Sequence, residues 1–300
     1  MSEFKDKVVV VTGAGGGLGK SHALEFARRG AKVVVNDLGG SGDGHGASDM
    51  ADVVVEEIRA AGGVAIANKA SVSDKAGAKS IIDDAVAEFG TVDVLVNNAG
   101  ILRDKSFKKM PLEDWDIVMD VHLNGTAYVT HAVWPIMYDK NYGRIIMTSS
   151  TSGIYGNFGQ ANYGAAKMGM LGLINVLSKE GASKNIRVNG LSPNAATRLI
   201  ATIPGRQDLD PDNPAPEAHP RLVTPAVLFM ASEDAPNGTV IQAGGGRFSV
   251  CAVFNNDDVD LGLDVTLEDL QAHREQLLDM SEAQEGWNMI RRYREQQQQQ

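Results

Sequence analysis

Hydrophobic runs and amphipathic stretches alternate along most of the chain. Residues 7–11 end in four valines, a pattern that is typical of a strand buried on both faces. The next stretch, residues 18–29, places apolar side chains at helical spacing and ends at Gly30. This pair predicts one strand followed by one helix.

The same alternation repeats along the chain. Further strands are predicted at 32–36, 64–68, 92–96, 144–148, 186–191 and 239–242, and further helices at 49–61, 74–89, 112–140, 162–180 and 224–232. Pro135 should kink or divide the fourth helical stretch, because proline removes a helical hydrogen bond. Seven strands alternating with helices predict an α/β fold with a doubly wound parallel sheet, the Rossmann fold.

Three segments depart from this rhythm. Residues 38–48 are rich in glycine, and residues 208–220 are rich in proline and aspartate. Both follow predicted strands, where the ligand crevice of an open α/β sheet lies, so 208–220 is either a substrate lid or a plain surface connection. Beyond residue 246, capping-box patterns at Thr266 and Ser281 predict helices. We therefore expect one large α/β domain at 1–246, a helical extension at 247–295 and a disordered tail at 296–300.

Composition excludes some classes of function. The chain has 300 residues, 43% of them hydrophobic, and a formal net charge of −10. Acidic proteins of this kind do not bind nucleic acid without sequence preference and are repelled by anionic membranes. We expect no nucleic-acid or membrane partner.

Cysteine and histidine usage narrows the setting. The single cysteine, Cys251, cannot form an internal disulfide, which favours a reducing compartment such as the cytoplasm. The six histidines show no metal-binding spacing, so we expect no metal. No signal-peptide pattern and no apolar run of about 18 residues is evident.

A glycine-rich turn follows the first strand, with the sequence TGAGGGLG at residues 12–19. Gly13 allows a tight turn, and Gly17 and Gly19 let the backbone approach a diphosphate at the helix N-terminus beside Leu18. Asp37 ends the second strand without an adjacent cation, and a carboxylate there favours NAD over NADP. The turn NNAG follows the fourth strand, and the small size of its residues, among them Asn97, Ala99 and Gly100, would let a cofactor lie against the sheet.

Three further residues indicate proton transfer. Tyr163 and Lys167 stand four residues apart, so both can face one side of a helix, and Ser150 precedes them after a strand. A lysine ammonium would lower the pKa of the tyrosine, which could then accept a proton from an alcohol oriented by Ser150. Tyr155 has no lysine four residues on, so it is not the expected base.

The order and spacing of these elements resemble the short-chain dehydrogenase/reductase family over residues 5–245. More narrowly, segments such as GILRDKSF and SGIYGNFGQANYGAAK resemble the (3R)-hydroxyacyl-CoA dehydrogenase, or 17β-hydroxysteroid dehydrogenase, part of peroxisomal multifunctional enzymes of type 2. The resemblance implies an NAD site that also contains Ser71, Val72, Pro193 and Asn194, and a homodimer or homotetramer formed through the long helices at 112–140 and 162–180. Asn194 replaces the glycine usual in the family, so we expect it to adopt a positive φ.

The family's relay asparagine aligns with His122 in this chain, which makes His122 a candidate catalytic residue, with Asn124 as the alternative. In the family it is the backbone carbonyl at this position that holds a relay water.

The substrate is less defined by the sequence. Arg103 and Lys105, with Lys108 and Lys109, form either a clamp for CoA phosphates or a solvated charged loop. Tyr155 and Phe158 could wall the substrate pocket. Three functions remain open: a (3R)-3-hydroxyacyl-CoA dehydrogenase, a hydroxysteroid dehydrogenase, and a non-catalytic NAD-binding regulator, which would not need all of Ser150, Tyr163 and Lys167.

Overall fold

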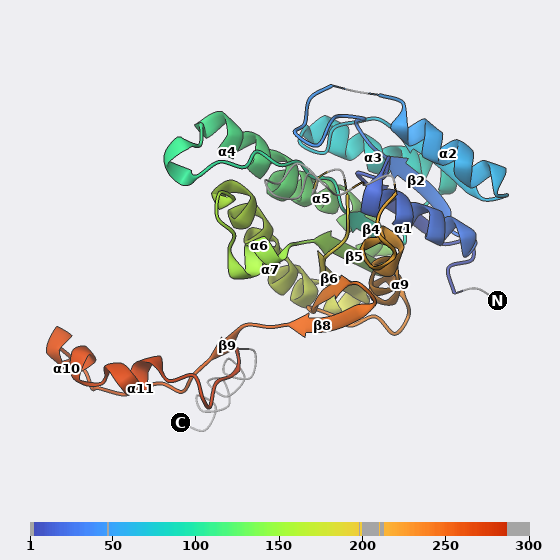
Figure 1. Cartoon of the computed structure of the whole chain (residues 1–300). Coiled ribbons are helices and arrows are strands. Elements are labelled where there is room, and N and C mark those ends of the chain that lie inside the picture. Colours follow the sequence, from blue (N-terminus) through green and yellow to red (C-terminus); the bar gives the residue numbers. More distant parts are fainter. Residues whose placement is uncertain (1–2, 47, 198, 200–209, 211–212, 287–300) are drawn as a thin grey trace. The chain divides into compact units, whose positions relative to one another are not determined.

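A computed structural model of the chain describes residues 3–46, 48–197, 199, 210 and 213–286. An eight-stranded sheet has the order β3-β2-β1-β4-β5-β6-β7-β8 (Figure 1). The strands are β1 (Val8–Thr12), β2 (Lys32–Asn36), β3 (Val64–Asn68), β4 (Val94–Asn97), β5 (Gly143–Thr148), β6 (Ile186–Pro193), β7 (Val240–Gly244) and β8 (Arg247–Cys251). The first seven pair in parallel, which confirms the predicted doubly wound sheet.

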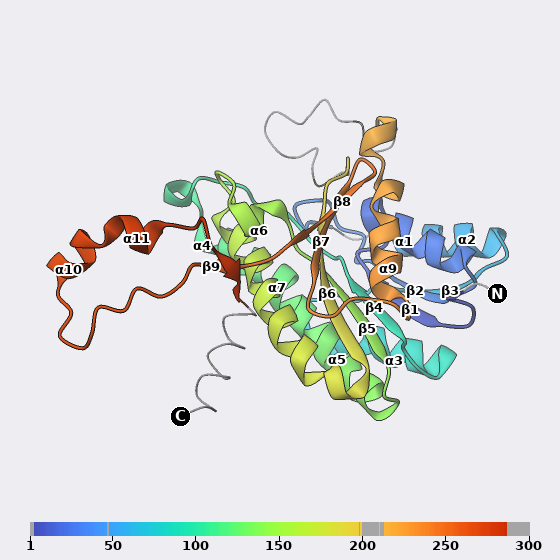
Figure 2. The same cartoon turned by 90° about the horizontal axis from the view of Figure 1, so that it is seen from below.

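Helices cover both faces of this sheet (Figure 2). One face carries α1 (Gly17–Arg28), α2 (Met50–Ala60) and α9 (Thr224–Ala231), and the other carries α3 (Lys75–Phe89), α5 (Gly125–Asp139) and α7 (Ala161–Glu180). The central strands are buried on both faces, since every residue of β1, β4 and β5 is buried. This double coverage explains their unbroken hydrophobic runs.

The predicted helix at 112–140 consists of three pieces. α4 (Leu112–Met119) leads into η2 (Asp120–Asn124), a π-helical turn, and then into α5. We predicted that Pro135 would kink or divide this helix. Pro135 lies inside α5, which continues past it, so the proline does not divide the helix. The interruption therefore lies eleven or more residues before the proline, at a turn that the hydrophobic pattern did not mark.

An eighth strand follows the seventh where we predicted the helical extension to begin. Gly245 and Gly246, both with positive φ, connect β7 to β8. A two-residue connection with positive φ at both positions is the usual hairpin turn, which keeps β8 on the edge of the main sheet. The first compact unit consequently runs to Val250, and the second comprises residues 251–300.

The described part of the second unit combines two short helices with a two-stranded antiparallel sheet. Thr266 caps α10 (Leu267–Ala272) through the predicted capping box, and α11 (Arg274–Leu278) follows. The second predicted box, at Ser281, opens no helix, because β10 (Gln284–Glu285) pairs there with β9 (Phe254–Asn255). The predicted tail at 296–300 lies outside the described residues, as do residues 208, 209, 211 and 212 of the predicted lid. The described part of the lid contains the short 3₁₀ helix η4 (Pro216–Ala218) and the first residue of η5 (Pro220–Leu222).

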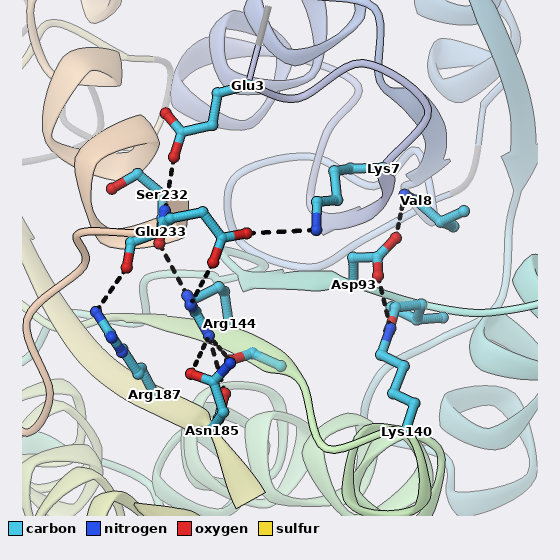
Figure 3. Close-up of polar contacts among 12 residues, drawn as sticks. Glu3, Lys7, Val8, Asp93, Lys140, Arg144, Asn185, Arg187, Ser232 and Glu233 are labelled. Carbon is cyan, nitrogen blue, oxygen red and sulfur yellow. Dashed lines mark hydrogen bonds and ion pairs between the residues drawn. The ribbon is translucent and has the colours of Figure 1, made fainter.

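At the amino-terminal ends of the parallel strands, polar side chains link several strands (Figure 3). Arg144 of β5 has a completely buried side chain that donates to the carbonyl oxygens of Ser232, Gly143 and Asn185, each at 2.9 Å. Asp93 joins these links from the start of β4: it accepts from the Val8 amide at 2.8 Å and pairs with Lys140 at 2.7 Å. These contacts lie at the amino-terminal ends of the strands, whereas ligands bind at the carboxyl ends.

Candidate active site

The turn between β1 and α1 depends on its glycines. Gly13 has φ +63°, and a Cβ there would lie 2.7 Å from the Ala99 Cα. A Cβ on Gly19 would lie 2.2 Å from the carbonyl oxygen of Gly13. No side chain caps α1 at Gly16, so the amides of its first turn remain available to an anion.

Asp37 is fixed to this turn at the end of β2. Its Oδ2 accepts from the Gly15 amide and its Oδ1 from the Gly39 amide, both at 2.7 Å. The two bonds hold the carboxylate beside the glycine turn, where the hydroxyls of an adenosine ribose would lie.

Thr12 and Asn98 join the turn to the segment after β4. The Thr12 hydroxyl accepts from the amides of Asn98 at 3.0 Å and Ala99 at 3.1 Å, and the Asn98 side chain donates to the carbonyl oxygen of Gly13 at 3.0 Å. We singled out neither residue, although both lie within the motifs TGAGGGLG and NNAG. Asn97, which we predicted to bind cofactor, is buried, and its side chain donates to Thr130 at 3.0 Å.

The three predicted catalytic residues meet at the ends of β5 and α7. Ser150 caps α6 (Thr151–Tyr155) and hydrogen-bonds the Tyr163 side chain. One turn along α7, the buried Lys167 donates to the carbonyl oxygen of Thr148 at 2.5 Å, and its Nζ lies 5.4 Å from the centre of the Tyr163 ring.

The protonation of this cluster differs from our expectation. Removal from water raises the pKa of Tyr163 to about 12, although the hydrogen bond with Ser150 opposes this rise. Burial also lowers the pKa of Lys167 to about 7. We predicted that the lysine would lower the tyrosine pKa, but among the groups that the protein itself supplies the largest influence on this pKa is burial of the phenol.

These elements line one cavity of about 450 Å³. The predicted residues that line it are Gly13, Gly17, Leu18, Asp37, Ser71, Val72, Ala99, Gly100, His122, Ser150, Tyr163, Lys167 and Pro193. Lys167 is the one lysine or arginine among the described lining residues. A cavity lined by a glycine turn and by a Ser–Tyr–Lys cluster, with uncapped helix amides beside the turn, fits a nicotinamide dinucleotide.

Other predicted residues lie away from this cavity. Gly19 is packed against the turn, and Asn194 hydrogen-bonds the Ala243 carbonyl through its amide. Asn194 does not have the positive φ that we expected, since the positive-φ residues other than glycine are Asp6, Asn141 and Asn185 within the described ranges. The neighbouring strand accommodates the Asn194 backbone through Gly244, because a Cβ on Gly244 would lie 2.5 Å from the Asn194 carbonyl oxygen.

The predicted substrate residues are also outside the cavity lining. Arg103 and Lys105 both pair with Asp114, at 3.3 and 2.8 Å, so part of their charge is neutralised. Tyr155 is 69% exposed and accepts from Gln242, while Phe158 is 91% exposed.

No group of three or more potential metal ligands gathers within the described residues, and no described helix is long and apolar enough to cross a membrane.

Comparison with known proteins agrees with this geometry. A family model described as short chain dehydrogenase matches residues 7–202. The chain is 48% identical over 285 residues to a short-chain type dehydrogenase/reductase of Mycobacterium tuberculosis, a match that covers 94% of this chain and 98% of that protein.

Two multifunctional proteins are also similar. Identity is 54% over 248 residues with peroxisomal multifunctional enzyme A of Dictyostelium discoideum, covering 82% of this chain and 54% of that protein. The solved structure of full-length peroxisomal multifunctional enzyme type 2 from Drosophila melanogaster matches with a TM-score of 0.76 and 40% identity, over 93% of this chain and 46% of that one. The chain thus spans about half the length of these two relatives.

Proposed function

The chain belongs to the short-chain dehydrogenase/reductase family of nicotinamide-dependent oxidoreductases, and from this we propose that it is an NAD-dependent (3R)-3-hydroxyacyl-CoA dehydrogenase. The observation that carries the proposal is the convergence of Ser150, Tyr163 and Lys167 on the cavity that also contains Asp37 and the glycine turn. A non-catalytic regulator would not need this cluster.

Each catalytic group has a distinct task in alcohol oxidation. The Ser150 hydroxyl holds the alcohol oxygen, and the Tyr163 phenolate oxygen accepts its proton. Lys167, anchored on the Thr148 carbonyl, places a positive charge next to the phenol when protonated and holds the nicotinamide ribose. When bound, NAD accepts the hydride and brings the positive charge of its ring near Tyr163, which favours the phenolate.

The acyl-CoA substrate is supported by the resemblance to multifunctional enzymes of type 2 and by the identity with such proteins. Lys108 and Lys109 lie in η1 (Phe107–Lys109) and form no ion pair with the described residues. They therefore offer more available charge for CoA phosphates than Arg103 and Lys105, which share Asp114.

A substrate panel tests the proposal directly. NADH formation is measured with (3R)- and (3S)-3-hydroxyacyl-CoA of several chain lengths and with hydroxysteroids. The proposal expects the (3R)-hydroxyacyl-CoA series to give the highest kcat/KM. Oxidation of the hydroxysteroids alone would support the rival 17β-hydroxysteroid activity and refute the acyl-CoA assignment.

We predict that Asp37 determines the choice of NAD over NADP. Asp37→Ala should reduce the NAD-over-NADP ratio of kcat/KM roughly tenfold or more, because a carboxylate repels the 2′-phosphate of NADP. The measurement is kcat/KM for both cofactors in the parent and the variant.

Asp37→Asn is the matched variant, because an amide oxygen can still accept from one of the two backbone amides that Asp37 holds. A reduced ratio in both variants identifies the negative charge as the cause. Equal use of NAD and NADP by the parent protein would contradict the prediction.

We also predict at least a homodimer, formed through α5 and α7. Tyr138 on α5 and Met168 and Val176 on α7 are large hydrophobic side chains that are exposed in the single chain. Pairing these helices with a second copy about a two-fold axis would cover them. Light scattering at micromolar protein should give twice the chain mass or more, and a monomer would count against the interface.

We propose the cytoplasm as the location of the enzyme, on the ground of its single cysteine, Cys251. We predicted a boundary after residue 246, but β8 belongs to the main sheet, so we propose that the unit ending at Val250 carries the whole active site and that the residues after it form an extension. Activity of a chain truncated after β8 would test the second of these proposals.

A further inference from the structure

His122 is a buried imidazole for which the mechanism above has no task. It lies in η2, the π-helical turn between α4 and α5, and its side chain is 0% exposed. A π-helical turn adds a residue to the helix and so re-aims the side chains on it, and such turns are frequent at functional sites. Here the turn directs His122 toward α7.

One ring nitrogen of His122 attaches it to the segment after β4. Nε2 lies 2.7 Å from the carbonyl oxygen of Ile101 and 3.0 Å from its amide nitrogen. Gly100, which lines the cavity, leaves room for the ring, since a Cβ there would lie 2.3 Å from the His122 Cε1. The imidazole is thus fixed in place from the cofactor side of the site.

The ring also packs against the proposed base. The His122 and Tyr163 rings meet edge to face, with centroids 5.0 Å apart and an interplanar angle of 90°. The other nitrogen, Nδ1, is buried and has no hydrogen-bond partner in the described part of the chain. Burial and the nearby Lys167 lower the pKa of His122, so the ring that touches Tyr163 is uncharged.

We propose that His122 is a positioning residue whose imidazole holds the Tyr163 ring against the segment after β4 and shields from water the side of that ring that it contacts. The proposal rests on the role of Tyr163 as the base in the proposed function. The asparagine usual at this position in the family has hydrogen-bonding groups for Ile101 but no ring to pack on Tyr163. The aromatic contact is therefore a property of the histidine.

The proposal makes a statement about pH. The charged or titratable groups that act on Tyr163 are Lys167, one turn along α7, and Asp104, whose charge raises the tyrosine pKa, with His122 packed on the ring. Removal from water is the largest cause of the raised pKa of Tyr163. Admitting water should lower that pKa, and because the base acts when deprotonated, the rise of kcat with pH should move to lower pH.

Three variants separate positioning from mere packing. In His122→Asn the contact with the ring is lost, so kcat should fall roughly tenfold or more through misplacement of the base, and the rise of kcat should move to lower pH. In His122→Phe the ring contact is retained but the hydrogen bond of Nε2 to the Ile101 backbone is lost, so kcat should fall while the pH profile stays with the parent. In Gly100→Ala the added Cβ should displace His122 and lower kcat.

In the His122→Asn background, the same Gly100→Ala change should lower kcat by a factor at least several-fold smaller than it does in the parent. The reason is that the shorter side chain leaves space for the Cβ. All assays use whichever secondary alcohol the parent oxidises best in the panel. Lack of activity on hydroxyacyl-CoA then refutes the proposed function, while the variant-to-parent ratios still test His122.

Two results would overturn the inference. One is a His122→Asn protein with the parent's kcat and pH profile. The other is a loss of kcat without any movement of the pH profile, together with equal harm from Gly100→Ala in both backgrounds, which would leave His122 only a packing role.

Discussion

Tyr163→Phe is expected to lower turnover by roughly 10²-fold or more, the scale on which positioned acid–base groups contribute. The change removes the phenol oxygen that would accept the alcohol proton and keeps the ring that packs on His122. NAD binding should survive, because the glycine turn, Asp37 and Lys167, which also line the cavity, are unchanged. Steady-state turnover and a separate NAD-binding titration check the two parts.

Tyr155→Phe is the matched control, since it removes the same oxygen from a nearby tyrosine. The Tyr155 hydroxyl is exposed and accepts a hydrogen bond from Gln242 at 2.7 Å, away from the cavity lining. We expect it to retain substantial turnover. Near-normal activity of Tyr163→Phe beside an inactive Tyr155→Phe would show that the active site has been assigned to the wrong tyrosine.

Arg144→Met should destabilise the fold by about 3 kcal/mol or more. Three backbone carbonyls accept from this buried guanidinium, and methionine would leave them in the interior without their donor (Figure 3). The effect is measured as the free energy of unfolding from urea denaturation. Catalytic constants of the protein that remains folded should change little, because Arg144 lies at the opposite ends of the strands from the cavity.

Lys79→Met provides the comparison for an exposed charge. Lys79 pairs with Asp83 one turn along α3, and both side chains are more than half exposed. Such pairs contribute about 0.5 kcal/mol or less, so this variant should unfold almost as the parent does. A loss for Arg144→Met no larger than that for Lys79→Met would contradict the structural role assigned to Arg144.

The fold was predictable where burial produced a clear pattern. Strands buried on both faces read as hydrophobic runs, and the helices between them show amphipathic spacing, so both were found to within a few residues. β8 was missed because it is an edge strand with mostly exposed side chains, and its sequence carries no unbroken apolar run. The helix predicted at Ser281 was wrong because a capping pattern is local, whereas the pairing of β10 with β9 joins residues about 30 apart.

For the site too, local motifs were predictable and contacts between distant segments were not. Motifs tied to one turn or one helix, such as Gly13 at the glycine turn or Tyr163 with Lys167 on α7, came together in one cavity. Contacts between distant segments could not be read from spacing: the Thr12 and Asn98 bonds, the Asn97–Thr130 bond and the Asp114 pairs with Arg103 and Lys105 all depend on the topology. The raised pKa of Tyr163 also depends on burial, which the spacing of a motif does not report.

The polar links at the amino-terminal ends of the strands have a consequence for how such a protein can change over evolutionary time. Asp93 and Arg144 hold β1, β4 and β5 together at one end of the strands, with α9 attached through the carbonyl of Ser232. The segments that would meet a substrate leave the same strands at the other end. Insertions and substitutions there can accumulate without weakening these links, so one scaffold can acquire a new substrate range while its folding stability is inherited almost unchanged.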